Sequence, residues 1–179
     1  LEVARQPAHE EKQEIAEVGN AEKVPLDIAL LFDISGTTNS MFEFEQITAI
    51  KFLQNMMKPE DKATIFTIGA SPILVKGRDT AQNAGVSIKN IVPTKEYTAF
   101  FDTVRVAAEY LNKNTPEGRR KVIVVISDGE DMNSAAIAKA IQNGYQSLGK
   151  NFDKLDNKSL YEFTVKSRND ANAKERARV

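Results

Sequence analysis

The chain has 179 residues, of which 41% are hydrophobic and 27% are charged, and its formal net charge at pH 7 is -1. This composition fits one globular domain with a sizeable core, and the near-neutral charge, with no Lys/Arg cluster among aromatic residues, argues against nucleic acid as a partner. The absence of cysteine excludes disulfides and zinc-thiolate sites, and no apolar stretch is long enough to insert directly into a membrane.

The chain is expected to begin with a polar arm or linker over residues 1–23, where acidic residues are frequent and no strong apolar face repeats. A domain covering residues 24–179 is expected to follow. Its first predicted strand lies at 24–32 and is almost continuously apolar after Asp27. That pattern is typical of a central parallel strand that is covered on both faces.

The next predicted element is a helix, because apolar residues recur every three or four positions from Phe42 to Met56 before Pro59 ends the pattern. The aromatic residues Phe42, Phe44 and Phe52 in this helix are expected to lie in the core. Residues 62–68 then alternate as a strand does.

A turn at 69–72 leads from that strand into 73–75, which is predicted to be an antiparallel edge strand. Further along, the pattern predicts a short helix within 79–91 and a clear helix over 98–111. Residues 122–126 form a second continuous apolar strand.

Helical patterns return at 134–148 and 159–179, with a polar stretch between them, and no further strand is visible. We therefore expect 149–179 to form an atypical helical C-terminal segment. The alternation of strands and helices predicts an α/β fold, a doubly wound, mostly parallel sheet with one antiparallel edge strand and helices on both faces. Because a helix leaving a parallel sheet usually returns to another strand, the last strand of this sheet is expected to be missing.

Oxygen-bearing side chains follow both of the apolar strands. The first strand runs into Asp33-Ile34-Ser35-Gly36-Thr37, and the second runs into Ser127-Asp128-Gly129. The carboxyl ends of parallel strands share one edge of a sheet, where ligands bind, so Asp33 and Asp128 are expected to converge. Thr98 adds a hydroxyl at the start of a helix between them. Carboxylate and hydroxyl oxygens suit a hard cation, Mg²⁺ or else Mn²⁺ or Ca²⁺.

These segments resemble the von Willebrand factor type A domain over residues 24–134, and particularly a bacterial branch with Ser-Asp-Gly-Glu-Asp after the fourth strand. The resemblance implies a Rossmann-like fold with a metal-ion-dependent adhesion site, at which an Asp or Glu of a protein partner completes the metal coordination. It also implies an extracellular or periplasmic location. The metal ligands implied for this chain are Asp33, Ser35, Thr37, Thr98 and Asp128.

Three residues depart from the family pattern. Thr37 stands where serine is usual, which keeps the hydroxyl and adds a methyl group close to the cation. Glu96 and Tyr97 stand where relatives often have glycines. Glu96 could compete for the metal if its loop folds inward, and Tyr97, on a loop beside the site, is a candidate for partner contact.

Each signal also has a purely structural interpretation. Asp, Ser and Thr commonly satisfy free amides at the turn between a strand and a helix, and Thr98 by itself is well placed to be an N-cap. We expect Glu130 and Asp131 to form a solvated acidic rim rather than to bind the metal. His9 is expected to be a solvated residue of the polar arm.

The leading functional hypothesis is a non-enzymatic, cation-dependent protein-binding module. The first alternative is a magnesium-dependent phosphatase of the haloacid-dehalogenase type, because such enzymes also use an aspartate after a strand. Those enzymes usually carry a second Asp two positions later as the general acid, where this chain has Ser35. The second alternative is a structural domain whose site holds no metal.

Overall fold

The computed structural model describes residues 24–35, 39–127, 131–149 and 154–178. The polar arm expected at 1–23 lies outside these residues and stays a prediction. Within the described residues, no helix combines the length and the apolar character needed to cross a membrane.

A four-stranded sheet lies at the centre of the fold, with the strand order β3-β2-β1-β4. Its strands are β1 (Leu26–Asp33), β2 (Lys62–Ile68), β3 (Ile73–Asp79) and β4 (Arg120–Ile126). β1 pairs in parallel with both β2 and β4, whereas β3 is antiparallel to β2. The mostly parallel sheet with one antiparallel edge strand is therefore confirmed, and no strand follows β4 among the described residues.

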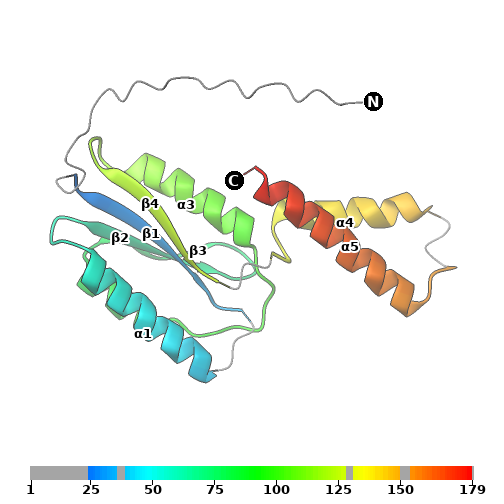
Figure 1. The fold of residues 1–179 in the computed structure, drawn as a ribbon, viewed down its shortest axis with the longest axis horizontal. Coiled ribbons are helices and arrows are strands. Elements are labelled where there is room, and N and C mark those ends of the chain that lie inside the picture. Colours follow the sequence, from blue (N-terminus) through cyan, green and yellow to red (C-terminus); the bar gives the residue numbers. More distant parts are fainter. Residues whose placement is uncertain (1–23, 36–38, 128–130, 150–153, 179) are drawn as a thin grey trace, which may run out of the picture.

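Helices cover both faces of this sheet (Figure 1). α1 (Asn39–Met56) and α2 (Ala81–Lys89) pack on one face, and α3 (Phe100–Asn114) packs on the other. The remaining helices, α4 (Ala135–Leu148) and α5 (Asn157–Arg176), follow β4. The α/β class and the helices on both faces agree with the sequence prediction.

Alternate residues of β1 supply the two halves of the core. Ile28, Leu30 and Phe32 face α1 and α2, while Ala29 and Leu31 face α3. Successive side chains of a strand point to opposite faces, so a strand covered on both sides must be apolar at nearly every position. This explains the continuous apolar run that identified β1 in the sequence.

The buried face of α1 is narrower than its apolar pattern suggests. Phe42 is buried and makes an edge-to-face contact with Phe32, and Phe52 is partly buried. Phe44, however, is 69% exposed, so the expectation that it lies in the core is wrong. The helix turns Phe44 away from the sheet, because it lies two positions from Phe42 and about 200° around the helix axis.

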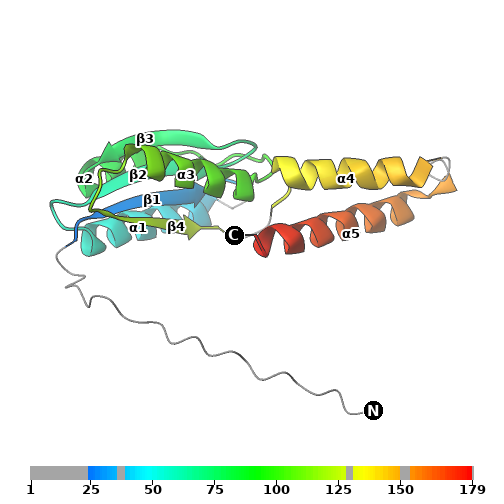
Figure 2. The ribbon, with the colours of Figure 1, turned by 90° about the horizontal axis from the view of Figure 1, so that it is seen from above.

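α4 and α5 form a hairpin that extends away from the sheet (Figures 1 and 2). The two helices pack closely, because a Cβ on Gly144 would lie 3.0 Å from Ser167 Oγ and 3.1 Å from Phe163 Cε1. Tyr145 adds a ring contact with Phe163 and a hydrogen bond with Thr164. A small apolar cluster of Phe101, Ile137 and Ala171 joins the base of the hairpin to α3.

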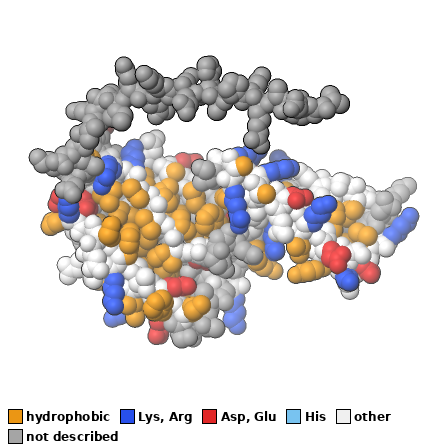
Figure 3. All heavy atoms as spheres, in the orientation of Figure 1, with side chains coloured by type: hydrophobic (Ala, Val, Ile, Leu, Met, Phe, Trp, Pro, Cys, Tyr) orange, Lys and Arg blue, Asp and Glu red, His pale blue; other side chains and the backbone are white. Residues whose placement is uncertain are grey.

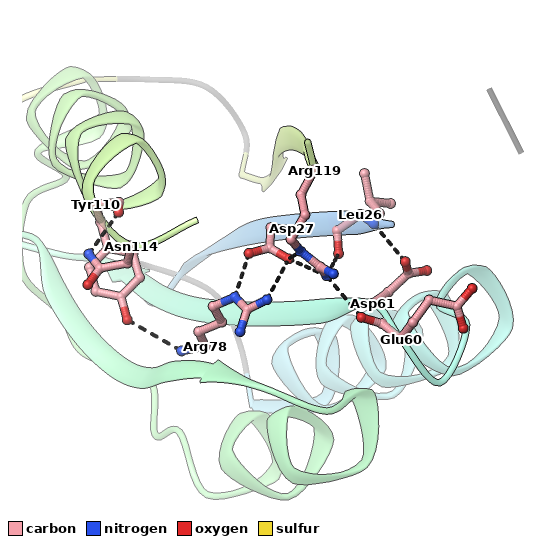
Figure 4. Close-up of polar contacts among 8 residues, drawn as sticks. All are labelled: Leu26, Asp27, Glu60, Asp61, Arg78, Tyr110, Asn114 and Arg119. Atoms are coloured by element: carbon pink, nitrogen blue, oxygen red, sulfur yellow. Dashed lines mark hydrogen bonds and ion pairs between the residues drawn. The ribbon is translucent and has the colours of Figure 1, made fainter. Parts of the chain in front are cut away.

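A buried ion cluster holds the opposite end of β1 (Figure 4). The Asp27 carboxylate accepts hydrogen bonds from Arg78 Nε at 2.6 Å and from Arg119 Nε at 2.6 Å. Burial by itself would raise the pKa of Asp27, but the hydrogen bonds and positive charges of both arginines outweigh it, so the pKa is lowered. Arg119 also donates to the backbone carbonyls of Leu26 and Glu60 and thereby ties three segments together.

Candidate metal centre

Asp33 lies at the carboxyl end of β1 and organises the polar groups around it. Its Oδ1 accepts hydrogen bonds from the Ser35 amide at 2.9 Å and from Ser35 Oγ at 2.8 Å. Its Oδ2 accepts a hydrogen bond from Ser127 Oγ at 2.6 Å. The carboxylate is largely buried, with 8% of the residue exposed. The ends of β1 and β4 therefore meet at one carboxylate, as the parallel topology predicts.

Ser127 is a site residue that the sequence prediction missed. It directly follows β4, and its hydroxyl lies beside Asp33 although the two residues are far apart in sequence. The sequence could have indicated Ser127, because β1 and β4 run in parallel and the residues that follow them must lie at the same edge of the sheet.

Thr98 is buried at the start of α3, but it is not the helix N-cap. Ala99 occupies the N-cap position, without a side-chain capping bond. The amide of Phe101 is instead bonded to the carboxylate of Asp131, and the amide of Asp102 to the hydroxyl of Ser134. Thr98 is therefore not the N-cap of α3, and the capping interpretation is wrong.

The backbone around Thr98 is fixed from two sides. The Thr98 carbonyl accepts hydrogen bonds from the amides of Met132 and Asn133, and the Ala99 amide donates to the carbonyl of Gly69 at the end of β2. This loop is thereby joined to the carboxyl end of β2 and to the segment that follows β4.

Asp131 is buried rather than part of a solvated rim, which corrects the sequence expectation. The residue is 1% exposed, and its carboxylate accepts hydrogen bonds from the amides of Phe101, Asn133 and Ser134. In return, Asp102 accepts a hydrogen bond from the Ala135 amide at the start of α4. Carboxylates are favourable at helix N-termini, so α3 and α4 cap each other.

The remaining predicted ligands, Thr37 and Asp128, lie outside the described residues, as does Glu130. The complete ligand set therefore stays a prediction. In the part of the chain that the structure describes, no group of three or more acidic or histidine side chains is arranged to hold a metal. The predicted centre differs from such a group because it relies mainly on hydroxyl oxygens.

Glu96 and Tyr97, which stand where relatives often have glycines, lie at the surface beside Thr98. Glu96 is exposed, and its Oε2 lies 3.9 Å from the position that a Cβ on Gly69 would take. Tyr97 is 67% exposed. Both side chains are thus available at the surface beside Thr98.

The described donors fit a hard divalent cation chemically. One carboxylate and two serine hydroxyls meet at the carboxyl end of parallel strands, and oxygen donors of this kind are the ones that Mg²⁺ and Mn²⁺ prefer. The Ser35 hydroxyl keeps lone pairs while it donates to Asp33, so this hydrogen bond and metal binding by Ser35 are compatible.

Comparison with known proteins identifies the family of this chain. The family model of the von Willebrand factor type A domain matches residues 28–130, and the chain belongs to this family. A search among curated proteins found no significant match.

Solved structures show the same fold at low sequence identity. An aerotolerance-related membrane protein from Bacteroides fragilis has a TM-score of 0.53 and 19% identity, and the match covers 85% of this chain and 96% of that one. The conserved hypothetical protein BatB from Bacteroides thetaiotaomicron has a TM-score of 0.53 and 18% identity, with 68% and 62% covered.

A third similar structure is proximal thread matrix protein 1 from the mussel byssus, with a zinc-occupied metal-ion-dependent adhesion site. Its TM-score is 0.52 at 17% identity, and the match covers 69% of this chain. This chain spans 34% of the mussel protein and 62% of BatB, so it corresponds to only part of each.

Proposed function

We propose that this chain is a non-enzymatic, divalent-cation-dependent protein-binding module. The observation that carries the proposal is the convergence of Asp33, Ser35 and Ser127 at the carboxyl edge of the sheet. Thr98 supports it, because it is buried in the loop that is joined to the carboxyl end of β2. Membership of a family of interaction domains, and a structural neighbour with zinc at its adhesion site, agree with this function.

The proposed ligands are Asp33, Ser35, Thr37, Thr98 and Asp128, with Mg²⁺, Mn²⁺ or Ca²⁺ as the metal. In this set only Asp33 and Asp128 carry negative charge, and hydroxyls supply the other oxygens. A dication held by two carboxylates keeps affinity for one more anionic oxygen. The proposed partner is therefore a protein that presents an Asp or Glu side chain to this edge.

Cation titration tests the proposal directly. Mg²⁺, Mn²⁺ and Ca²⁺ are each titrated into the chain while heat release and melting temperature are recorded. At a hundredfold excess over the dissociation constant, one cation should stabilise the fold by about 2.7 kcal/mol. For a chain of this length that corresponds to a rise of roughly 5–10 °C in Tm.

Matched variants link this effect to the site. Asp33→Asn should abolish the cation-dependent rise, because it removes a charge and keeps the side-chain shape. Glu117→Ala, which changes an exposed acid in the loop before β4, should leave the rise intact. If no cation stabilises the wild-type chain, or if Asp33→Asn responds equally, the metal proposal fails and the metal-free structural alternative is favoured.

The open coordination position has its own test. Water-proton relaxation detects exchangeable water on bound Mn²⁺, and acetate is a simple probe for a partner carboxylate. Acetate should lower the relaxation enhancement of the Mn²⁺ complex, whereas methanesulfonate at the same ionic strength should not. If acetate leaves the relaxation enhancement unchanged, the metal has no open coordination position for a partner carboxylate.

The phosphatase alternative receives no comparable support, since the matched family model is that of an interaction domain. An assay with p-nitrophenyl phosphate and Mg²⁺ separates the two classes. Turnover that is lost in Asp33→Asn would favour the enzyme.

A further inference from the structure

The loop over residues 94–99 crosses the carboxyl edge of the sheet and is fixed at both ends. At its start, the amide of Thr94 donates a hydrogen bond to the carbonyl of Ile34 at 2.6 Å. At its end, the amide of Ala99 donates to the carbonyl of Gly69 at 2.7 Å. Ile34 is the first residue after β1 and Gly69 is the first after β2. The loop is therefore held against the ends of both strands.

Glu96 stands in the middle of this loop, and its carboxylate lies over the sheet edge. Its Oε2 is 3.9 Å from the position that a Cβ on Gly69 would take, and that position is 3.2 Å from Ile34 Cδ1. Gly69 has no side chain of its own to keep the carboxylate away. The Glu96 carboxylate therefore lies close to the residue that directly follows Asp33.

The Glu96 carboxylate is not committed to any other group. In the part of the chain that the structure describes, it takes part in no hydrogen bond and no ion pair, whereas the Asp79 carboxylate is paired with Lys76 at 2.9 Å. Figure 3 shows one face of the molecule, on which the Lys and Arg side chains of the described residues are scattered and form no patch that would attract an acid. The carboxylate is therefore available to a cation held beside it.

We propose that Glu96 is a reversible internal ligand of the metal, which fills the open coordination position until the acid of a protein partner displaces it. This inference rests on the proposed function, because it needs a cation held by Asp33 and Thr98. Glu96 is two residues before Thr98, so their Cα atoms are at most about 7 Å apart. A carboxylate oxygen suits a hard dication, and a ligand tethered this closely has a high effective concentration.

An internal ligand makes the site selective. The apparent affinity for an external acid falls in proportion to the fraction of time for which the coordination position is open. If Glu96 is bound for about two-thirds of the time, every external carboxylate binds about threefold more weakly. Tyr97, the next residue along the loop, is 67% exposed and can contact a protein partner. A partner that makes such further contacts regains the lost affinity, whereas an isolated carboxylate does not.

The test uses the whole chain with Mn²⁺ as the metal and acetate as the external acid. Glu96→Gln keeps the side-chain shape and removes the charge. It should weaken Mn²⁺ binding about threefold in calorimetric titration and lower the acetate concentration for half effect on water-proton relaxation by the same factor. The two factors should be equal, because one competing equilibrium causes both. Without acetate, the Mn²⁺ complex of Glu96→Gln should also show a higher relaxation enhancement, because water replaces the internal carboxylate.

Glu117→Gln is the matched control, because it removes the same charge from an exposed residue in the loop before β4. It should equal the wild type in all three measurements, and circular dichroism confirms that both variants are folded. The inference is overturned if Glu96→Gln binds acetate as the wild type does, or if acetate binding changes while Mn²⁺ affinity does not. The proposed function survives either result as long as Asp33→Asn abolishes Mn²⁺ binding. A wild-type chain that binds no Mn²⁺ overturns both.

Discussion

Replacing Asp27 with asparagine should destabilise the fold strongly although Asp27 is far from the candidate metal centre. Asp27 is 1% exposed, and its carboxylate is the shared partner of Arg78 and Arg119. The substitution would keep the side-chain volume but lose the charge, and the new amide group would face at least one guanidinium. The two arginines would then be left without their counter-ion.

The magnitude follows from the burial of each partner. Breaking a buried ion pair from one side costs about 3–5 kcal/mol. The Arg78 side chain is 29% exposed and the Arg119 side chain 13%, so solvent screens part of this loss. We therefore expect Asp27→Asn to lower the free energy of unfolding by about 2–4 kcal/mol at pH 7. Asp79→Asn, which breaks the more exposed pair with Lys76, is the control and should have a clearly smaller effect.

The difference in stability between wild type and Asp27→Asn should change with pH in a defined direction. The folded pKa of Asp27 is lowered, so its stabilisation is complete above the unfolded value of about 3.9 and is lost as pH falls through the folded value. In urea unfolding followed by circular dichroism, the difference in the free energy of unfolding between wild type and Asp27→Asn should narrow below about pH 4. A gap under about 0.5 kcal/mol at pH 7, or one that widens in acid, would refute the reasoning.

Three further changes test other parts of the structure. Ser127→Ala removes a hydrogen bond to Asp33 and should weaken Mn²⁺ binding about tenfold or more, measured by calorimetric titration. Asp131→Asn replaces a buried oxygen acceptor with a donor and should lower unfolding stability by about 2–4 kcal/mol in urea titration. Gly144→Val overpacks the helix hairpin and should cost about 1–3 kcal/mol, whereas Ala138→Val on the exposed side of α4 should cost less than about 1 kcal/mol.

Much of the fold was predictable because burial leaves a simple pattern. β1 is covered on both faces, so its run of apolar residues identified it as the central strand. The turn at 69–72 likewise identified β3 as an antiparallel neighbour. Phe44 was placed wrongly because an apolar residue within a helical pattern does not by itself say which way the helix faces, and surfaces also carry apolar side chains.

The candidate site was only partly predictable for a different reason. Asp33 was identified because it directly follows an apolar strand, and the same logic could have found Ser127. The role of Asp131 could not be read from its neighbours, since it depends on α3 and α4 starting beside each other in space. In an acidic run, sequence alone cannot separate a carboxylate that caps a helix from one that faces solvent.

The mutual capping of α3 and α4 couples the projecting α4–α5 hairpin mechanically to the sheet. Asp131 holds the start of α3, Asp102 holds the start of α4, and the amides of Met132 and Asn133 grip the carbonyl of Thr98. Any torque on the distal end of the hairpin is therefore transmitted to the backbone of Thr98, unless one of these bonds breaks first. A force applied to the distal end of the hairpin would therefore act on the loop at the carboxyl edge of the sheet.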